Sequence, residues 1–198
     1  DDYVLEVDLT PNRIDAASHY GVARDLAAWL DCHATHAGLH RPSVEAFATD
    51  DAGAKAVSVA VESEACTRYC GLTIRDVKVA ESPEWLKDRL QAIGLHSINN
   101  IVDITNYILH AIGQPLHCFD LAKIKGEQVI VKTAEQGRKF VTLDEAERTL
   151  DAADLMICNA EEPMCIAGVF GGLDSGVTDA TTSIFLESAC FAPTSVRR

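Results

Sequence analysis

Residues 82–120 read SPEWLKDRLQAIGLHSINNIVDITNYILHAIGQPLHCFD and contain the change from helical to extended patterning that decides the fold. Ser82-Pro83-Glu84 is a favourable helix start, because a capping residue precedes a proline at the first helical position. Apolar residues then recur every three or four positions as far as Gly94, and again from Ile101 to Gly113. This spacing predicts two amphipathic helices, each ended by a glycine. Residues 116–120 follow as an extended segment.

Short extended segments dominate the rest of the sequence. Alternating or apolar runs between turn residues predict strands at 4–9, 57–61, 69–79, 129–133, 140–143, 155–159, 165–170 and 184–189. A helix is expected up to Leu30 with Asp15 as its cap, and the strands 57–61 and 69–79 are expected to pair across the turn at 63–67. Helices that mostly precede the strands predict an α+β fold, with a mixed or antiparallel sheet core and the N-terminal helices packed on it.

The balance of charges excludes one class of function. The 198 residues include 17 Lys and Arg against 30 Asp and Glu, which gives a net charge of −13. The basic residues are scattered, with few close pairs such as Lys123/Lys125, Arg138/Lys139 and Arg197/Arg198. Phosphate binding requires clustered cations, so a protein that holds nucleic acid by charge alone is not expected.

Length and composition bound the organisation of the chain. The 47% hydrophobic and 24% charged residues are globular proportions. We expect one domain over residues 1–198, with a possible small lobe at 1–80 and a larger lobe at 81–198. Pro193 opens a further element close to Arg198, so the C-terminal boundary is expected to be truncated. The opening residues lack a signal peptide and no apolar run approaches the ~18 residues of a membrane span, which predicts a cytoplasmic protein without membrane contact.

Seven cysteines raise the question of a metal site. Most of them lie in apolar stretches, which favours buried, reduced thiols. The alternative is zinc, bound by His33, His36 and His40 together with cysteines such as Cys32 and Cys66. Gly38 interrupts the histidine segment and the cysteine spacing is unlike that of known zinc knuckles. The sequence therefore predicts no metal.

Blocks of sequence are more informative than any single motif, since no nucleotide-binding loop, nucleophile elbow or HExxH is present. The blocks are Thr10–Asp15 with Gly21–Leu26, Ile98–Tyr107, Gly113–Asp120, Thr142–Asp144 with Glu147 and Arg148, Ile166–Gly172, and Leu186–Ala189. In these blocks, and in their order, the chain resembles the editing region of the beta subunits of bacterial phenylalanyl-tRNA synthetase.

The resemblance implies a part of a phenylalanine–tRNA ligase, an aminoacyl-tRNA synthetase of protein synthesis built as a heterotetramer of two alpha and two beta subunits. It implies that the alpha subunit charges tRNA(Phe) with ATP and magnesium, and that this fragment needs no cofactor. The region is implied to hydrolyse tyrosine wrongly attached to that tRNA. Such editing is needed because an apolar pocket cannot strongly reject an added hydroxyl group.

Four site residues follow from the resemblance. Glu187 matches the carboxylate that binds the tyrosine hydroxyl, His117 matches the editing histidine near the ester and its water, and Gly171 matches a close approach of backbone to substrate. His96 stands where many relatives carry Arg or Lys, and is expected to contact the terminal adenosine or the substrate.

The residues by themselves leave other interpretations of these positions open. A solvated strand glutamate, a loop histidine and an ordinary Gly-Gly turn would give the same sequence. The alternation of Phe185, Glu187 and Ala189 predicts that they share one face of a strand, which would place the carboxylate on a partly apolar wall.

The expected mechanism is direct attack of water on the aminoacyl ester. Cys118 follows His117, but adjacent strand residues point to opposite faces, so the two are not expected to act as a nucleophile and its base. His117 and backbone groups around Gly171 would orient the water. The alternative function is a catalytically silent scaffold that docks tRNA and other domains of the same synthetase.

Overall fold

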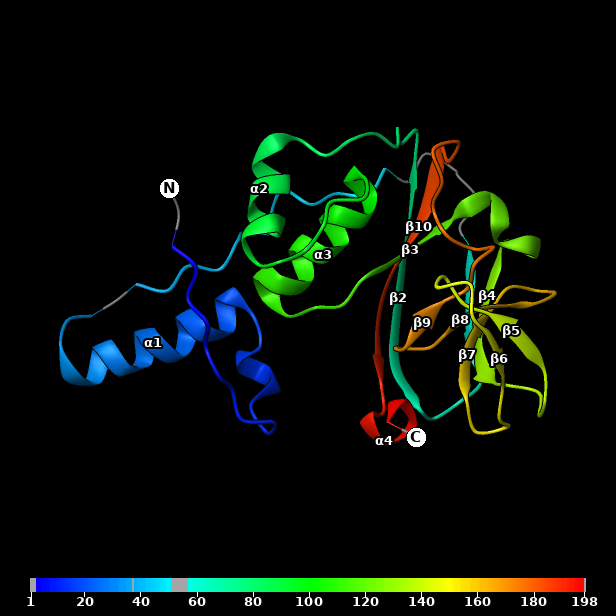
Figure 1. The fold of residues 1–198 in the computed structure, drawn as a ribbon, viewed down its shortest axis with the longest axis horizontal. Helices are drawn as coiled ribbons and strands as arrows, with labels where there is room; N and C mark the ends of the chain where they lie inside the picture. The colour runs from blue at the N-terminus through cyan, green and yellow to red at the C-terminus, as the bar shows by residue number, and fades with distance from the viewer. Residues whose placement is uncertain (1–2, 37, 51–56, 198) are drawn as a thin grey trace. The chain divides into compact units, whose positions relative to one another are not determined.

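The computed structural model describes residues 3–36, 38–50 and 57–197, and Figure 1 shows the chain as a ribbon. It consists of two compact units. The helical unit combines Asp1–Ala54 with Ser82–Pro115, and the sheet unit combines Lys55–Glu81 with Leu116–Arg198. This division differs from lobes at 1–80 and 81–198, because each unit is assembled from two separate segments of the chain.

The helical unit contains the short helix η1 and three longer helices. Their bounds are Ile14–Ala16 for η1, His19–His33 for α1, Glu84–Ala92 for α2 and Asn100–Ile112 for α3. The two helices predicted within residues 82–113 are confirmed, and the glycines Gly94 and Gly113 after them both have φ of +82°. This left-handed conformation is one that glycine adopts without strain, which explains why the helices end there.

The start of the helical unit differs from the prediction in two ways. Ser18 caps α1 by accepting a hydrogen bond from the Gly21 amide at 3.0 Å, whereas Asp15 lies in η1 and pairs with Arg13 and Arg24. The predicted strand at 4–9 is wrong, since these residues have no regular structure. Alternating apolar residues fit a strand, but a strand needs a partner, and no strand of the described chain pairs with this segment.

A buried aspartate fixes the connection between α2 and α3. Asp103 is completely buried and accepts hydrogen bonds from the Ser82 hydroxyl, the Ser97 hydroxyl and the Ile98 amide. Burial alone would raise the pKa of Asp103, but these hydrogen bonds outweigh it and lower the pKa. Ser82 is thus used to hold this loop and does not cap α2 with its side chain, contrary to the prediction.

The sheet unit contains ten strands within the described residues. They are β1 (Ser58–Val61), β2 (Cys66–Arg75), β3 (His117–Asp120), β4 (Gln128–Thr133), β5 (Lys139–Val141), β6 (Glu147–Thr149), β7 (Leu155–Cys158), β8 (Pro163–Ile166), β9 (Phe170–Gly171) and β10 (Ser183–Phe191). The short helices η2 (Leu121–Lys123), η3 (Lys125–Glu127) and α4 (Pro193–Val196) connect or follow them.

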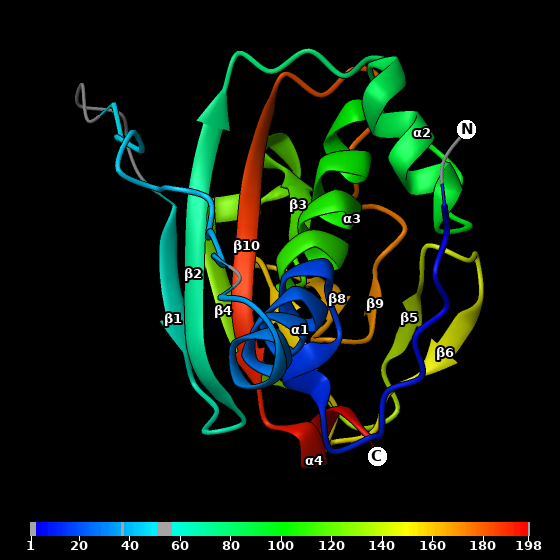
Figure 2. The ribbon, with the colours of Figure 1, turned by 90° about the vertical axis from the view of Figure 1, so that its left-hand side faces the viewer.

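The strands form one mixed sheet, one antiparallel sheet and a hairpin. The first has the order β1-β4-β7-β8-β9, with β1 parallel to β4, and the second has the order β2-β10-β3. In the third, β5 pairs with β6. The long strands β2 and β10 run side by side in Figure 2. The helices and mixed sheets confirm the predicted α+β class, while the packing of the helices on the sheets stays a prediction.

Two predictions about the strands are wrong. The strands β1 and β2 do not pair with each other: β1 pairs with β4 in the five-stranded sheet, and β2 pairs with β10 in the three-stranded sheet. The strand predicted at 165–170 is two strands, since Gly168 has φ of +71° and makes a turn between β8 and β9. Alternation along a strand shows which side is buried but does not select the neighbouring strand.

The core of the sheet unit lies between its two larger sheets. Phe119 and Phe185 come from the three-stranded sheet and are almost completely buried. They belong to one apolar cluster with Val129, Val131 and Ile157 from the five-stranded sheet. The inner face of β10 therefore faces an apolar interior, which decides the environment of the polar side chains on that face. No helix of the described residues is long and apolar enough to cross a membrane.

Candidate active site

Glu187 lies at the middle of the three-stranded sheet, on its buried face. In the strand register it stands opposite His117 of β3 on one side and Gly71 of β2 on the other. It is 6% exposed, and Phe185, two residues earlier on the same face, is 2% exposed. The predicted apolar wall around the carboxylate is therefore confirmed for these two residues.

The Glu187 carboxylate has one strong partner, Tyr69. The Tyr69 hydroxyl donates a hydrogen bond to Oε2 of Glu187 over 2.7 Å. Burial raises the pKa of Glu187 to about 7, although the hydrogen bond from Tyr69 acts in the opposite direction. Burial and the neighbouring carboxylate also raise the pKa of Tyr69, so its hydroxyl keeps its proton and remains a donor.

His117 presents an unused polar atom inside the protein. Its Nε2 is enclosed and has no hydrogen-bond partner, the one buried side-chain nitrogen or oxygen of the described residues in this condition. Burial lowers the pKa of His117 to about 4, so the ring is neutral at pH 7. An enclosed polar atom without a partner is unfavourable by about 1–3 kcal/mol, and a bound water or ligand atom would remove that penalty.

Gly171 lies directly beside the His117 ring. A Cβ atom built on Gly171 would stand 3.0 Å from Cε1 of His117 and 2.8 Å from Cδ1 of Leu143. The glycine is thus required by lack of space, since any side chain would push against the histidine. The three predicted residues Glu187, His117 and Gly171 are therefore brought together, with His117 between the other two.

The residues that form this arrangement lie in a region that matches a known protein family. Residues 65–198, which include all of these positions, match the family described as B3/4 domain. The chain belongs to the B3/4 domain family. In this B3/4 domain chain, the matched residues span β2 to β10 and therefore contain the whole of the sheet that carries Glu187 and His117.

Relatives of this B3/4 domain chain agree in name. It is similar over its whole length to the phenylalanine–tRNA ligase beta subunits of Bacteroides fragilis (65% identical), Porphyromonas gingivalis (62%) and Salinibacter ruber (46%). It spans 24%, 24% and 23% of their lengths, respectively. These similarities confirm the resemblance to the beta subunits of phenylalanyl-tRNA synthetase that the sequence blocks indicated.

A solved structure supports the fold. An N-terminal fragment of the phenylalanyl-tRNA synthetase beta subunit from Pyrococcus horikoshii superimposes with a TM-score of 0.52. The likeness covers 93% of this chain and 55% of that fragment, with 19% of residues identical. At this level of identity, the likeness concerns the architecture of the B3/4 domain chain and not its individual residues.

The fourth predicted residue, His96, belongs to the helical unit. It is exposed in the loop between α2 and α3, next to Ser97, which is held by Asp103. The hydrogen bond from the Ser97 hydroxyl to Asp103 anchors this loop. The role of His96 toward a substrate stays a prediction.

Tyr69 is the residue that sequence reasoning missed. It lies at the start of the predicted strand 69–79, two residues before Gly71, and residues two apart on a strand share a face. The pairing of β2 with β10 was needed to bring that face to Glu187. The sequence around Tyr69 therefore could not indicate its contact with Glu187, because that contact depends on the pairing of two strands that are distant in the sequence.

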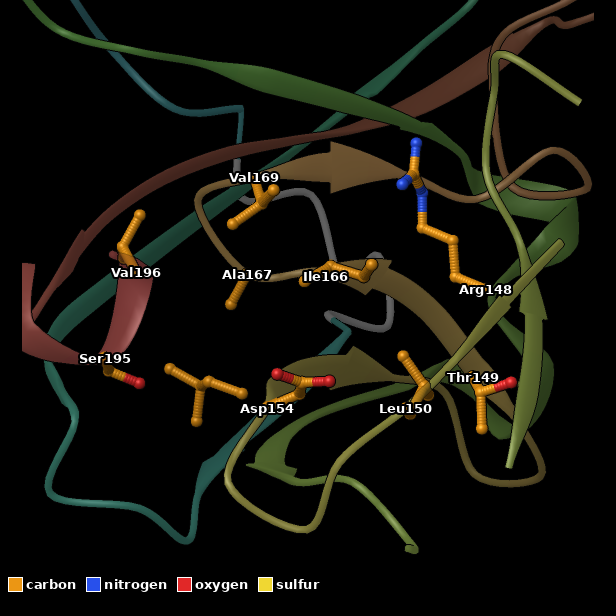
Figure 3. A pocket seen from close by; sticks show the side chains of 10 residues that line it. Arg148, Thr149, Leu150, Asp154, Ile166, Ala167, Val169, Ser195 and Val196 are labelled. Carbon is orange, nitrogen blue, oxygen red and sulfur yellow. The ribbon is translucent and has the colours of Figure 1, made fainter. Parts of the chain in front are cut away.

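Two cavities of the described residues are not lined by Glu187 or His117. One of about 310 Å³ is lined by residues such as Arg148, Asp154 and Ser195, as Figure 3 shows. A second, of about 450 Å³, is lined by residues that include the two basic pairs Lys123/Lys125 and Arg138/Lys139. The fold thus gathers cations that are scattered in the sequence.

Carboxylates already neutralise half of this basic cluster. Lys125 pairs with Glu161 and Glu162, and Lys139 pairs with Glu147. Two of the four cations around the second cavity are therefore engaged within the protein.

The thiols near the site are unsuited to nucleophilic attack. Burial raises the pKa of Cys118 to about 12 and also raises that of Cys165, so both remain protonated at pH 7. Within the part of the chain that the structure describes, no three His, Cys, Asp or Glu side chains are grouped as a metal would require. His33 and His36 instead bond to the Trp29 carbonyl and to Asp31.

Proposed function

We propose that this chain is the editing domain of a phenylalanine–tRNA ligase beta subunit, and that it hydrolyses the ester of tyrosine wrongly attached to tRNA(Phe). Membership of the B3/4 domain family and the names of its relatives support this proposal. The observation that carries it is the cross-strand pair of Glu187 and His117, with Gly171 beside the histidine. The alpha subunit and tRNA(Phe) are the proposed partners.

Glu187 has the properties that selection for tyrosine over phenylalanine requires. Its carboxylate lies on an apolar wall, where a hydrogen bond from a phenolic hydroxyl is worth more than in water. Phenylalanine would leave the buried oxygen without a partner, and that loss is unfavourable by about 1–3 kcal/mol. A site of this kind therefore rejects the correct amino acid and accepts the wrong one.

His117 has the properties of a group that positions water. Its neutral ring and unpaired Nε2 can accept a hydrogen bond from a water molecule or from a ribose hydroxyl. A pKa of about 4 makes it a weak base at pH 7, so its contribution is orientation more than proton removal. An aminoacyl ester is already activated, and positioning of the attacking water supplies much of the remaining acceleration.

A catalytically silent scaffold is the second candidate. The observation that favours it is the cavity lined by Lys123, Lys125, Arg138 and Lys139, because clustered cations are what a tRNA-docking scaffold requires. Deacylation of tyrosyl-tRNA(Phe) by the complete wild-type ligase separates the two, because a scaffold would leave the spontaneous rate unchanged. Hydrolysis well above the spontaneous rate supports editing by the ligase, and the site variants below assign it to this domain.

Replacing His117 by alanine in the complete ligase should slow the hydrolysis of tyrosyl-tRNA by roughly 10- to 100-fold, because the water loses its orienting acceptor. The preference for tyrosine over phenylalanine should change little, since His117 acts at the ester and not at the ring. Rapid-quench deacylation with both charged tRNAs measures this. His36→Ala, which removes an exposed histidine, is the matched control. A His117→Ala variant that altered only the preference would contradict the assignment.

A further inference from the structure

We propose that Tyr69 is a positioning residue for this site: it holds one oxygen of the Glu187 carboxylate so that the other is offered to the hydroxyl group of a bound tyrosine. The inference rests on the proposed function and adds to it the residue that sets the selectivity. Tyr69 would not touch the reacting ester. It would act through Glu187.

The register of the sheet allows Tyr69 to reach the carboxylate. Glu187 stands opposite Gly71, which has no side chain, and Tyr69 lies two residues before Gly71 on the same face of β2. Residues in this diagonal relation are about 7–8 Å apart at their Cα atoms, within reach of an aromatic side chain. The space above Gly71 is taken by the Phe185 ring, whose Cζ would be 2.0 Å from a Cβ at that position.

The two carboxylate oxygens of Glu187 are in different situations. Oε2 accepts the hydrogen bond from Tyr69 at 2.7 Å. Oε1 has no hydrogen bond to the described residues. Among those residues, His117 Nε2 is the one fully enclosed side-chain nitrogen or oxygen without a hydrogen-bond partner, so Oε1 is not fully enclosed. Oε1 is therefore the oxygen that we assign to the hydrogen bond with a ligand.

Holding one oxygen determines what the other can recognise. A free glutamate side chain can rotate and turn either oxygen away from a ligand. Tyr69 packs against the apolar cluster of the sheet unit, so its ring is itself fixed. A carboxylate anchored in this way meets the tyrosine hydroxyl without first losing conformational freedom, and it cannot turn aside to accommodate phenylalanine.

In the complete ligase, Tyr69→Phe should reduce the preference for tyrosyl-tRNA over phenylalanyl-tRNA by about tenfold, the effect of losing one charge-assisted hydrogen bond. The loss should appear mainly as a higher KM for tyrosyl-tRNA, with the rate on phenylalanyl-tRNA unchanged or raised. A purely structural role would lower both rates together. Tyr107→Phe is the control, because Tyr107 packs edge-on against Trp85 in the helical unit.

A titration of the 198-residue chain gives a second measurement. The titratable groups around Glu187 are Tyr69, Cys66, Cys165 and, across the strand, His117. Burial raises the pKa of the phenol and the thiols and lowers that of His117, so Glu187 alone of this group titrates near pH 7. Its carboxyl ¹³C resonance in Tyr69→Phe should titrate at a higher pH than in the wild type.

The outcomes separate this inference from the proposed function. If Glu187→Ala abolishes editing but Tyr69→Phe leaves the selectivity within twofold and the titration unmoved, only the role of Tyr69 is overturned. If Tyr69→Phe improves the binding of tyrosyl-tRNA, Tyr69 competes with the ligand for the carboxylate, which also overturns it. If Glu187→Ala has no effect, the proposed function fails first.

Discussion

Replacing Glu187 by alanine in the complete ligase should slow the hydrolysis of tyrosyl-tRNA(Phe) by roughly 10²-fold or more. The variant loses a charge-assisted hydrogen bond in a site shielded from water, where such bonds are at their strongest. Discrimination should weaken as well, because phenylalanine no longer leaves a carboxylate oxygen unpaired. Single-turnover deacylation of tyrosyl-tRNA and phenylalanyl-tRNA measures both effects.

Two controls make this result specific to editing. Aminoacylation with phenylalanine should stay near the wild-type rate, because the family resemblance implies that the alpha subunit carries out that reaction. Glu64→Ala removes an exposed glutamate from the turn between β1 and β2 and should leave editing unchanged. Unaltered hydrolysis of tyrosyl-tRNA by Glu187→Ala would show that Glu187 does not read the hydroxyl group.

Replacing Glu187 by glutamine should stabilise the sheet unit by about 3 kcal/mol at pH 8. The pKa of Glu187 is raised from 4.5 to about 7 in the folded protein, and a tenfold change in a protonation equilibrium corresponds to about 1.4 kcal/mol. The folded wild-type protein must therefore keep an unfavourable buried charge above pH 7. Glutamine has nearly the same shape, is neutral, and can still accept the hydrogen bond from Tyr69.

The stability difference between Glu187→Gln and the wild type depends on pH, because it arises from the raised pKa of Glu187. Stability from a raised carboxyl pKa is fully present below the unfolded value of 4.5 and is lost as the pH rises through about 7. The advantage of Glu187→Gln should therefore be near zero at pH 4.5 and reach its plateau just above pH 7. His117 has the opposite dependence, because its lowered pKa destabilises the fold as the pH falls below 6.5, but it is present in both proteins and cancels.

Hydrogen exchange of β10 amides is the suitable measurement. Both tryptophans, Trp29 and Trp85, lie in the helical unit, so their fluorescence would not follow the sheet unit. Equal protection of the wild type and Glu187→Gln at pH 8 would show that the carboxylate is not held at a cost to stability. A neutral variant that is more stable than the wild type is expected where a charged residue, here Glu187, is retained for function and not for stability.

Local structure was predictable where the signals lay close together in the sequence. The helices α2 and α3 were placed correctly because apolar periodicity and the glycines at 94 and 113 act within a few residues. The cap of α1 was assigned to Asp15 instead of Ser18, since both are good capping residues and sequence alone does not choose between them. Ser82 was misassigned for a different reason, because the distant Asp103 competes for its hydroxyl group.

The candidate site was predictable only in part. The apolar setting of one face of β10 followed from the alternation of Phe185 and Glu187, and the roles of Glu187, His117 and Gly171 came from the family resemblance. Tyr69 was missed because it is 118 residues from Glu187, and nothing local to either residue indicates the pairing of their strands. The wrong prediction that β1 pairs with β2 has the same origin, since both gain their partners from the second half of the chain.

On the ribosome, β2 emerges long before the strand that covers it. With 118 residues between Tyr69 and Glu187, a synthesis rate of roughly 5–20 residues per second leaves β2 without that partner for about 6–24 s. During this time its amide and carbonyl groups form an open edge on which another nascent chain could add. Arg68 and Arg75, near the two ends of β2, are exposed, and positive charges placed there discourage such edge-to-edge association before β10 arrives and also afterwards, because β2 remains an edge strand of its sheet.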